Sequence, residues 1–188
     1  MLKDLVKRNR SYRRFYQEVS VSMEILRELV DLARLSPSAA NRQPIKYFLS
    51  NTSETNSKIF SCLAWAGYLL EWPGPEEGER PAAYLIMLGD SRLTNNYFCD
   101  HGIAAQSILL GAVEKGLGGC IIGTVNRDKL RESLDIPSYF EILQVLAIGK
   151  PKETVVIDPL TDGDIKYWRD PNDVHHVPKR ALDDLIIS

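Results

Sequence analysis

The chain is organised around Arg8-Asn9-Arg10-Ser11-Tyr12-Arg13-Arg14-Phe15, close to its N-terminus. Four arginines fall within seven residues, and a serine hydroxyl stands among them. The guanidinium group is a planar fork of donors that matches the oxygens of a phosphate, and a hydroxyl adds a neutral donor. The stretch therefore predicts a site for a phosphorylated ligand. A solvated basic arm, a nucleic-acid patch and a juxtamembrane polybasic segment are the alternatives.

Length, charge and hydropathy narrow these alternatives. The chain has 188 residues, of which 44% are hydrophobic, enough for one folded domain over residues 1–188. Its net charge is -2 and its pI about 5.9, whereas a general nucleic-acid binder is usually basic overall. No apolar run approaches the ~20 residues of a membrane span, and the N-terminus lacks the apolar segment of a signal peptide. We therefore expect a cytoplasmic protein that binds neither nucleic acid nor membranes.

Hydrophobic periodicity predicts helices that alternate with strands along the chain. Helices are expected over residues 2–7, 23–35, 53–70, 95–115 and 126–136, and strands over 45–50, 81–88, 120–122 and 141–148. This order indicates an α+β fold, with helices on both sides of a sheet. Residues 152–178 show little periodicity, and one interpretation is that they wrap another subunit.

The middle of the longest predicted helix, residues 102–113, is apolar or small nearly all round. Such a helix is buried on several sides, and its small residues let another helix approach closely. A helix of a second subunit is one candidate for that neighbour.

The sequence contains no motif for a catalytic group carried by the protein itself. GxSxG, P-loop and HExxH motifs are all missing. Cys62, Cys99 and Cys120 are widely spaced and are expected to be reduced, mostly buried thiols. His175-His176 has no acidic or cysteine partner at ligand spacing, so we expect no metal and assign neither histidine a role.

A bound cofactor would therefore have to carry any reaction. Gly116-Leu117-Gly118-Gly119 follows a helix and opens a strand, the reverse of the order in a Rossmann fingerprint, so a dinucleotide site of that kind is excluded. The loop over residues 36–44, bracketed by two prolines, offers the amides of Asn41 and Gln43, which suit the edge of a heteroaromatic ring. Together with the arginine stretch, these features fit flavin mononucleotide (FMN).

Six sequence blocks, in order, resemble those of the FMN-dependent nitroreductase family. They cover most of the chain, and although each is weak alone, six in the right order are a strong signal. The blocks are residues 9–15, 33–44 (Ala-Arg-Leu-Ser-Pro-Ser-Ala-Ala-Asn-Arg-Gln-Pro), 80–84 (Arg-Pro-Ala-Ala-Tyr), 104–107 (Ala-Ala-Gln-Ser), 116–123 (Gly-Leu-Gly-Gly-Cys-Ile-Ile-Gly) and 179–180 (Lys-Arg).

The resemblance implies a central, mostly antiparallel sheet flanked by helices, in an intertwined homodimer with FMN at the subunit interface. It also implies a set of cofactor contacts, residue by residue. Arg10 and Ser11 are expected to hold the phosphate, and Arg180 to close on it from the C-terminus, with its neighbour Lys179 as a further cofactor contact. Arg13 is expected near the N1/O2 edge of the flavin, and Gly123 and Thr124 near N5, largely through backbone. The partner subunit is expected to supply Pro37, Ser38, Ala39 and Asn41, with Gln43 as a further contact.

The resemblance further implies an FMN-dependent oxidoreductase. In such enzymes a hydride passes from NAD(P)H through flavin N5 to an electron-poor acceptor, such as a nitroaromatic or quinone, by a ping-pong mechanism that needs no catalytic side chain. An FMN-binding protein without nicotinamide-dependent turnover, such as a carrier or sensor, is the alternative. Asn9 departs from the family, because many members have arginine there, and Arg8 could replace the lost charge. Candidates for the substrate wall are Trp65, Tyr68, Trp72 and Tyr167.

Overall fold

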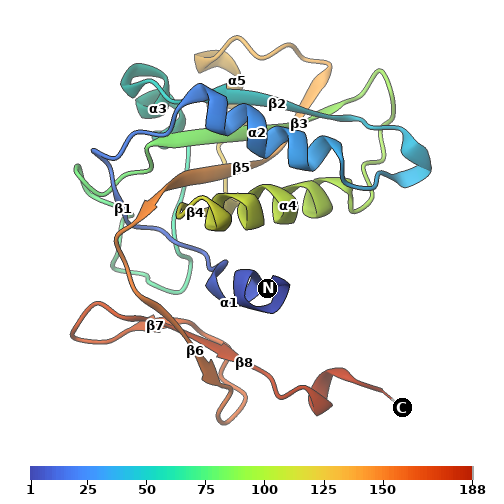
Figure 1. Ribbon diagram of the computed structural model, residues 1–188. Coiled ribbons are helices and arrows are strands. Elements are labelled where there is room, and N and C mark those ends of the chain that lie inside the picture. Colours follow the sequence, from blue (N-terminus) through green and yellow to red (C-terminus); the bar gives the residue numbers. More distant parts are fainter. Residues whose placement is uncertain (188) are drawn as a thin grey trace.

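A five-stranded antiparallel sheet forms the centre of the protein in the computed structural model, which describes residues 1–187 (Figure 1). The longest strand, β5, is its spine: β3 lies along one side of it, β4 along the other, and the short β1 pairs with its end. β2 continues the sheet beyond β3. The strands are β1 (Phe15–Tyr16), β2 (Ile45–Ser50), β3 (Ala83–Asp90), β4 (Gly118–Ile122) and β5 (Phe140–Pro151).

Helices cover both faces of this sheet, which confirms the α+β fold predicted from the sequence (Figure 1). α2 and α4 pack on one face, and α3 and α5 pack on the other. α1 lies beside α4. The α-helices among residues 1–187 are α1 (Leu2–Arg8), α2 (Met23–Arg34), α3 (Ser53–Phe60), α4 (Asp100–Glu114) and α5 (Arg127–Ser133).

Strand β3 is buried on both faces because its side chains alternate between two apolar cores. Leu85 and Met87 contribute to the core under α2 and α4, whereas Tyr84 and Ile86 contribute to the core under α3 and α5. A side-chain period of two places successive residues on opposite faces of a sheet. The uninterrupted apolar run in this part of the sequence is thus explained by cover on both sides.

Close packing of α2 against α4 depends on the small residues of α4. A side chain at Gly111 would collide with Leu32 of α2. Within one chain this close neighbour is α2. That a helix of a second subunit also packs against α4 stays a prediction. α2 begins at Ser22, whose hydroxyl accepts a hydrogen bond from the amide of Ile25 at 3.2 Å, an N-cap that satisfies an otherwise free helical donor.

The helix predicted over residues 53–70 is wrong in its second half. α3 ends at Phe60, and Leu63 then forms an isolated antiparallel bridge with Val125, while Ala66 has a positive φ of 42°. Pairing with a distant segment overrides the local helical preference here. The helix predicted from residue 95 likewise begins only at Asp100, after Phe98 with a φ of 45°.

Residues 152–178, which lack periodicity, form most of a second, three-stranded sheet below α1 (Figure 1). Its strands are β6 (Val155–Pro159), β7 (Trp168–Arg169) and β8 (His175–Lys179); β8 is parallel to β6 and antiparallel to β7. Beyond β8 the tail extends away from the body and contains a short 3₁₀ turn, Asp183–Leu185 (Figure 1). Its apolar residues Leu182, Leu185 and Ile186 are exposed.

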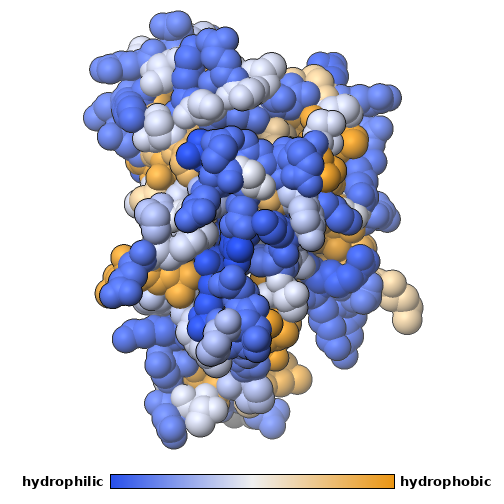
Figure 2. Space-filling model, turned by 90° about the vertical axis from the view of Figure 1, so that its left-hand side faces the viewer, coloured by the Kyte–Doolittle hydropathy of each residue, from blue (hydrophilic) through white to orange (hydrophobic). Residues whose placement is uncertain are grey.

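Figure 2 shows the side of the molecule that lies at the left of Figure 1. Hydrophilic residues cover most of this face, and hydrophobic ones form small separate patches. It has the composition of an ordinary solvent-exposed surface. Among residues 1–187, no helix combines the length and the apolar character that crossing a bilayer requires.

Candidate functional site

A cavity of about 290 Å³ lies where the arginine stretch meets β4, α4 and the C-terminal sheet. Residues far apart in the sequence come together there. Its walls include Arg10, Ser11 and Arg13 from the stretch, Gly119 from β4, and His175 and Lys179 from β8. The structure thus brings together four of the predicted cofactor residues: Arg10, Ser11, Arg13 and Lys179.

The arginine stretch is held against β4 through its backbone. Ser11 forms an isolated parallel bridge with Gly119, and the amide of Tyr12 donates to the carbonyl oxygen of Gly119 at 3.0 Å. A Cβ at Gly119 would lie 2.5 Å from the carbonyl oxygen of Ala147 and 2.7 Å from Leu109. Only glycine fits at this point, because the backbones approach so closely.

The cavity has the character of an anion site. Arg10 donates through Nη2 to the carbonyl oxygen of Val6 at 2.9 Å, whereas its Nε is buried without a hydrogen-bond partner among residues 1–187. Buried donors are normally satisfied, so this one indicates a missing acceptor. Arg13 and Lys179 add two further cations, and no carboxylate of the described residues lines the wall. These donors fit a phosphate group.

The four arginines of the stretch lie in different environments: Arg10 and Arg13 line the cavity, whereas Arg8 and Arg14 form ion pairs. Arg8 pairs with Asp4 of its own helix at 2.9 Å, is exposed and does not line the cavity. Arg14 binds Glu79 through two hydrogen bonds of 2.6 and 2.8 Å, and this pairing lowers the pKa of the Glu79 carboxyl to about 2. Asn9 lines the cavity, and its amide donates to the side chain of Gln106 at 3.3 Å.

Behind the cavity, Arg13 is surrounded by groups from the C-terminal part of the chain. The buried carboxylate of Glu153 accepts hydrogen bonds from the main-chain amides of Arg13 and Arg14, and from Nη2 of Arg169 at 3.0 Å. Nη1 of Arg13 lies 3.2 Å from Nε2 of His175. Sequence reasoning missed Glu153 and His175, because an aperiodic segment carries no signal that either is buried.

The loop predicted to bind the cofactor, residues 37–43, lies elsewhere on the same chain. The carboxylate of Asp100, at the start of α4, accepts hydrogen bonds from the hydroxyl of Ser38 at 2.7 Å and the amide of Ala39 at 2.9 Å. Ala40, Asn41 and Gln43 have φ values of 50–53°, in the left-handed region. Pro37, Ser38 and Gln43 line a separate cavity of about 230 Å³. One chain thus does not bring this loop to the arginine cavity.

The remaining predicted cofactor residues are exposed and do not line the arginine cavity. Gly123 and Thr124 follow β4; the carbonyl oxygen of Thr124 accepts from the amide of Ala64 at 3.0 Å, and that of Gly123 accepts from Arg127. Arg180 follows Lys179 and is likewise exposed.

The four candidate aromatic residues fall into two groups. Tyr167 lines the cavity, and its hydroxyl accepts from the amide of Tyr68 at 3.3 Å, whereas Tyr68 itself lines a different cavity together with Trp72. Trp65 is buried in the core against Phe60, with ring centroids 5.9 Å apart. The ring of Trp72 is partly buried against the same core, under the guanidinium of Arg169.

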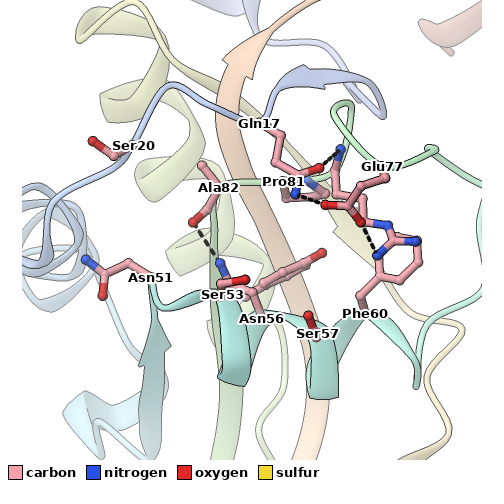
Figure 3. A pocket seen from close by; sticks show the side chains of 12 residues that line it. Gln17, Ser20, Asn51, Ser53, Asn56, Ser57, Phe60, Glu77, Pro81 and Ala82 are labelled. Carbon is pink, nitrogen blue, oxygen red and sulfur yellow. Dashed lines mark hydrogen bonds and ion pairs between the residues drawn. The ribbon is translucent and has the colours of Figure 1, made fainter.

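Another cavity, of about 190 Å³, lies on the α3 side of the sheet (Figure 3). Figure 3 shows Asn56, Ser57 and Phe60 of α3 on one wall, with Gln17 and Glu77 across from them. None of the predicted site residues lines it. Within residues 1–187, no group of three or more histidine, cysteine or acidic side chains is arranged to hold a metal ion. Of the three free cysteines, Cys62 and Cys120 are buried and Cys99 is exposed.

The sequence of the chain was compared with protein-family models and with known proteins. The family model described as "Nitroreductase family" matches residues 6–150. A relative from Archaeoglobus fulgidus, provisionally named an NADH dehydrogenase/NAD(P)H nitroreductase, is 26% identical over 148 residues, which cover 74% of this chain and 80% of that protein.

Solved structures show the same fold. A nitroreductase family protein from Streptococcus pneumoniae TIGR4 superposes with a TM-score of 0.69 at 18% identity, covering 100% of both chains. An FMN-dependent nitroreductase from Clostridium difficile R20291 has a TM-score of 0.63 at 22% identity, covering 89% of this chain and 92% of that one. The resemblance predicted from six short blocks is confirmed: the chain belongs to the nitroreductase family.

Proposed function

We propose that this protein is an FMN-dependent oxidoreductase that uses NAD(P)H to reduce an electron-poor acceptor, such as a nitroaromatic or a quinone. The observation that carries this proposal is the arginine cavity, which Arg10, Ser11, Arg13 and Lys179 line together and to which no carboxylate of residues 1–187 contributes. Relatives named as NAD(P)H nitroreductases and a structural neighbour named as FMN-dependent support the choice of donor and cofactor.

Arg10, Ser11 and Lys179 would hold the phosphate of FMN. The unpartnered Nε of Arg10 would gain the acceptor that it lacks, in a charge-assisted hydrogen bond. Arg180, exposed and next to Lys179, would add a further cation. Asn9 contributes no charge, and Arg8, exposed and paired with Asp4, would not replace it.

Arg13 would lie beside the N1/O2 edge of the flavin ring, where a cation favours the anionic reduced form. Bound FMN would supply the redox chemistry itself, accepting a hydride from NAD(P)H at N5 and passing it to the acceptor in a ping-pong sequence. The protein's own task is to bind, orient and polarise. Peptide groups of Gly123 and Thr124 would face N5, while Tyr68 and Tyr167 would border the substrate. Trp65, enclosed in the core, would act through packing alone.

A homodimer would complete the site, since one chain leaves Pro37, Ser38, Ala39 and Asn41 away from the arginine cavity. Asp100 holds this loop in a defined shape, with backbone groups at its surface, and Gln43 would add a further contact. The exposed apolar residues of the C-terminal tail would be covered by the partner. Sedimentation should show a dimer; a monomer that binds FMN tightly would contradict this part of the proposal.

The test is reconstitution of the purified protein with FMN, followed by NAD(P)H oxidation with and without a nitroaromatic or quinone. Retention of a yellow, stoichiometric flavin and acceptor-dependent oxidation of NAD(P)H are expected. Bound flavin that NAD(P)H does not reduce would instead indicate an FMN carrier or sensor. Protein that stays colourless after reconstitution would overturn the proposal.

A further inference from the structure

We propose that the C-terminal sheet positions Arg13 for the cofactor, with Nε2 of His175 as the acceptor that orients its guanidinium. This inference rests on the proposed function and assigns a role to a histidine for which the sequence suggested none. Glu153 and His175 both lie beyond residues 6–150, the part of the chain that the family model matches. They therefore form a support for the cofactor site from this chain's own C-terminal segment.

The first part of the support is Glu153, which fixes the backbone of the arginine stretch. Its side chain is 0% exposed, and a buried carboxylate is tolerated only when donors surround it. Two of its donors are the main-chain amides of Arg13 and Arg14, and the third is Nη2 of Arg169 in β7. The backbone at Arg13 is thereby tied to the C-terminal sheet.

The second part is His175, which orients the side chain of Arg13. Nη1 of Arg13 donates to the carbonyl oxygen of Ser11 at 3.2 Å and lies 3.2 Å from Nε2 of His175. Arginine has no acceptor and stays protonated, so a hydrogen bond here makes Nε2 of His175 the acceptor and leaves the ring proton on Nδ1, which is buried without a hydrogen-bond partner among residues 1–187. His175 is 1% exposed, and burial together with the nearby Arg13 charge lowers its pKa to about 4, which agrees with a neutral ring.

Tyr167 restricts the same guanidinium on one face. Its ring centroid lies 4.7 Å from the guanidinium carbon of Arg13 and 5.2 Å from the ring centroid of His175. Ser11 and His175 engage Nη1 of Arg13, and Tyr167 covers one face of its guanidinium. Nε and Nη2 of Arg13 make no hydrogen bond within residues 1–187. These donors are left for a ligand in the cavity, and the side chain is ordered before binding, which lowers the entropic cost of binding.

Two conservative replacements distinguish the acceptor role of Nε2 of His175 from the effects of side-chain size and polarity. The amide oxygen of glutamine reaches the position of Nε2 and can accept from Arg13, whereas the shorter asparagine reaches only the position of Nδ1. His176→Gln is the matched control, since His176 is the next residue of β8 and pairs with Asp158 at 2.7 Å instead. The readouts are the dissociation constant of FMN, from quenching of flavin fluorescence, and the midpoint potential of the bound flavin.

We expect His175→Asn to raise the dissociation constant about tenfold, as for loss of one hydrogen bond to a charged group, and to make the potential more negative. His175→Gln and His176→Gln should keep both quantities close to those of the unsubstituted protein. Equal values for His175→Asn and His175→Gln, whether both unchanged or both impaired, would overturn the positioning role while leaving the proposed function intact. Failure of the unsubstituted protein to bind FMN would instead overturn the proposed function, and this inference with it.

Discussion

Arg14 and Glu79 form a two-point ion pair, in which Nε and Nη2 of the guanidinium donate to the two carboxylate oxygens at 2.6 and 2.8 Å. The side chains are only 19% and 16% exposed, and Lys152 adds a second cation at 2.8 Å from the carboxylate. The pair ties the arginine stretch to the segment that leads into β3. It is a structural contact, whereas Arg10 and Arg13 line the arginine cavity.

The Arg14–Glu79 pair should make stability fall in acid. Hydrogen bonds from Arg14 lower the pKa of Glu79 from 4.5 to about 2 in the folded state, so the unfolded chain binds a proton first as the pH falls. The contribution is complete above pH 4.5 and is lost as the pH falls towards 2. Glu79→Gln should lower the free energy of unfolding by roughly 2 kcal/mol at pH 7 and by much less near pH 2. Urea unfolding over this range measures both.

Glu76→Gln is the control for Glu79→Gln, because Glu76 lies in the same loop and its side chain makes no ion pair among the described residues. Its free energy of unfolding should stay within about 0.5 kcal/mol of the unsubstituted protein. A constant difference between Glu79→Gln and the unsubstituted protein at every pH would contradict the assigned ionisation.

Arg10→Ala should weaken FMN binding about 10- to 100-fold, since a hydrogen bond to a charged group is worth roughly 1.5–3 kcal/mol. Arg8→Ala is a matched control in the same stretch, because Arg8 pairs with Asp4 outside the cavity. It should change the affinity by no more than about twofold, as expected for a charge outside the site. Fluorescence titration at several salt concentrations measures both; equal effects of the two substitutions would show that only the general charge of the stretch matters.

Gly119→Ala should destabilise the fold by about 1–3 kcal/mol, as overpacking does. The added Cβ would lie 2.5 Å from a main-chain oxygen, which cannot move without disturbing β5. Gly102→Ala, in α4, meets nothing within 4 Å and should instead raise stability by up to about 1 kcal/mol. Thermal unfolding measures these changes in stability, which have opposite signs. A Gly119→Ala variant as stable as the unsubstituted protein would mean that β4 and β5 are less closely packed than described.

Asp100→Ala should loosen the loop over residues 38–43. Ser38 and the amide of Ala39 would lose their shared acceptor, at a cost of about 1–3 kcal/mol for donors left unsatisfied. Hydrogen exchange should speed up at the amides of this loop while that of β3 stays slow. Asp128→Ala, at an exposed site in the first turn of α5, should leave exchange in the loop unchanged. Equal exchange in both variants would show that Asp100 does not hold the loop.

Much of the central fold could be predicted from local sequence patterns. The strand over 45–50 agrees residue for residue, and the apolar run of β3 correctly indicated a buried strand. Ser22 signalled the start of α2, and its side chain does cap the helix. Each of these features depends on periodicity or on a cap, which residues close in sequence are enough to define.

Predictions failed where distant segments decide the local structure. α3 stops at Phe60 because the following residues pair with the segment after β4, and no pattern within 53–70 encodes that partner. The C-terminal sheet was missed for the same reason: β7 has only two residues, and β6 and β8 acquire regular structure by pairing with each other. Strands this short gain their stability from their neighbours.

Within the arginine stretch, too, some properties follow from the local sequence and others from distant parts of the chain. Its residue types alone indicate an anion site, since guanidinium groups and a hydroxyl match phosphate whatever surrounds them. Which arginine faces the cavity depends partly on a local pair, Asp4 with Arg8 one helical turn apart, and mainly on tertiary contacts: Glu79 engages Arg14, and Glu153 and His175 contact Arg13. The chemistry of a side chain is local, whereas its orientation is set by partners up to 162 residues away, which only the folded chain brings within hydrogen-bonding distance.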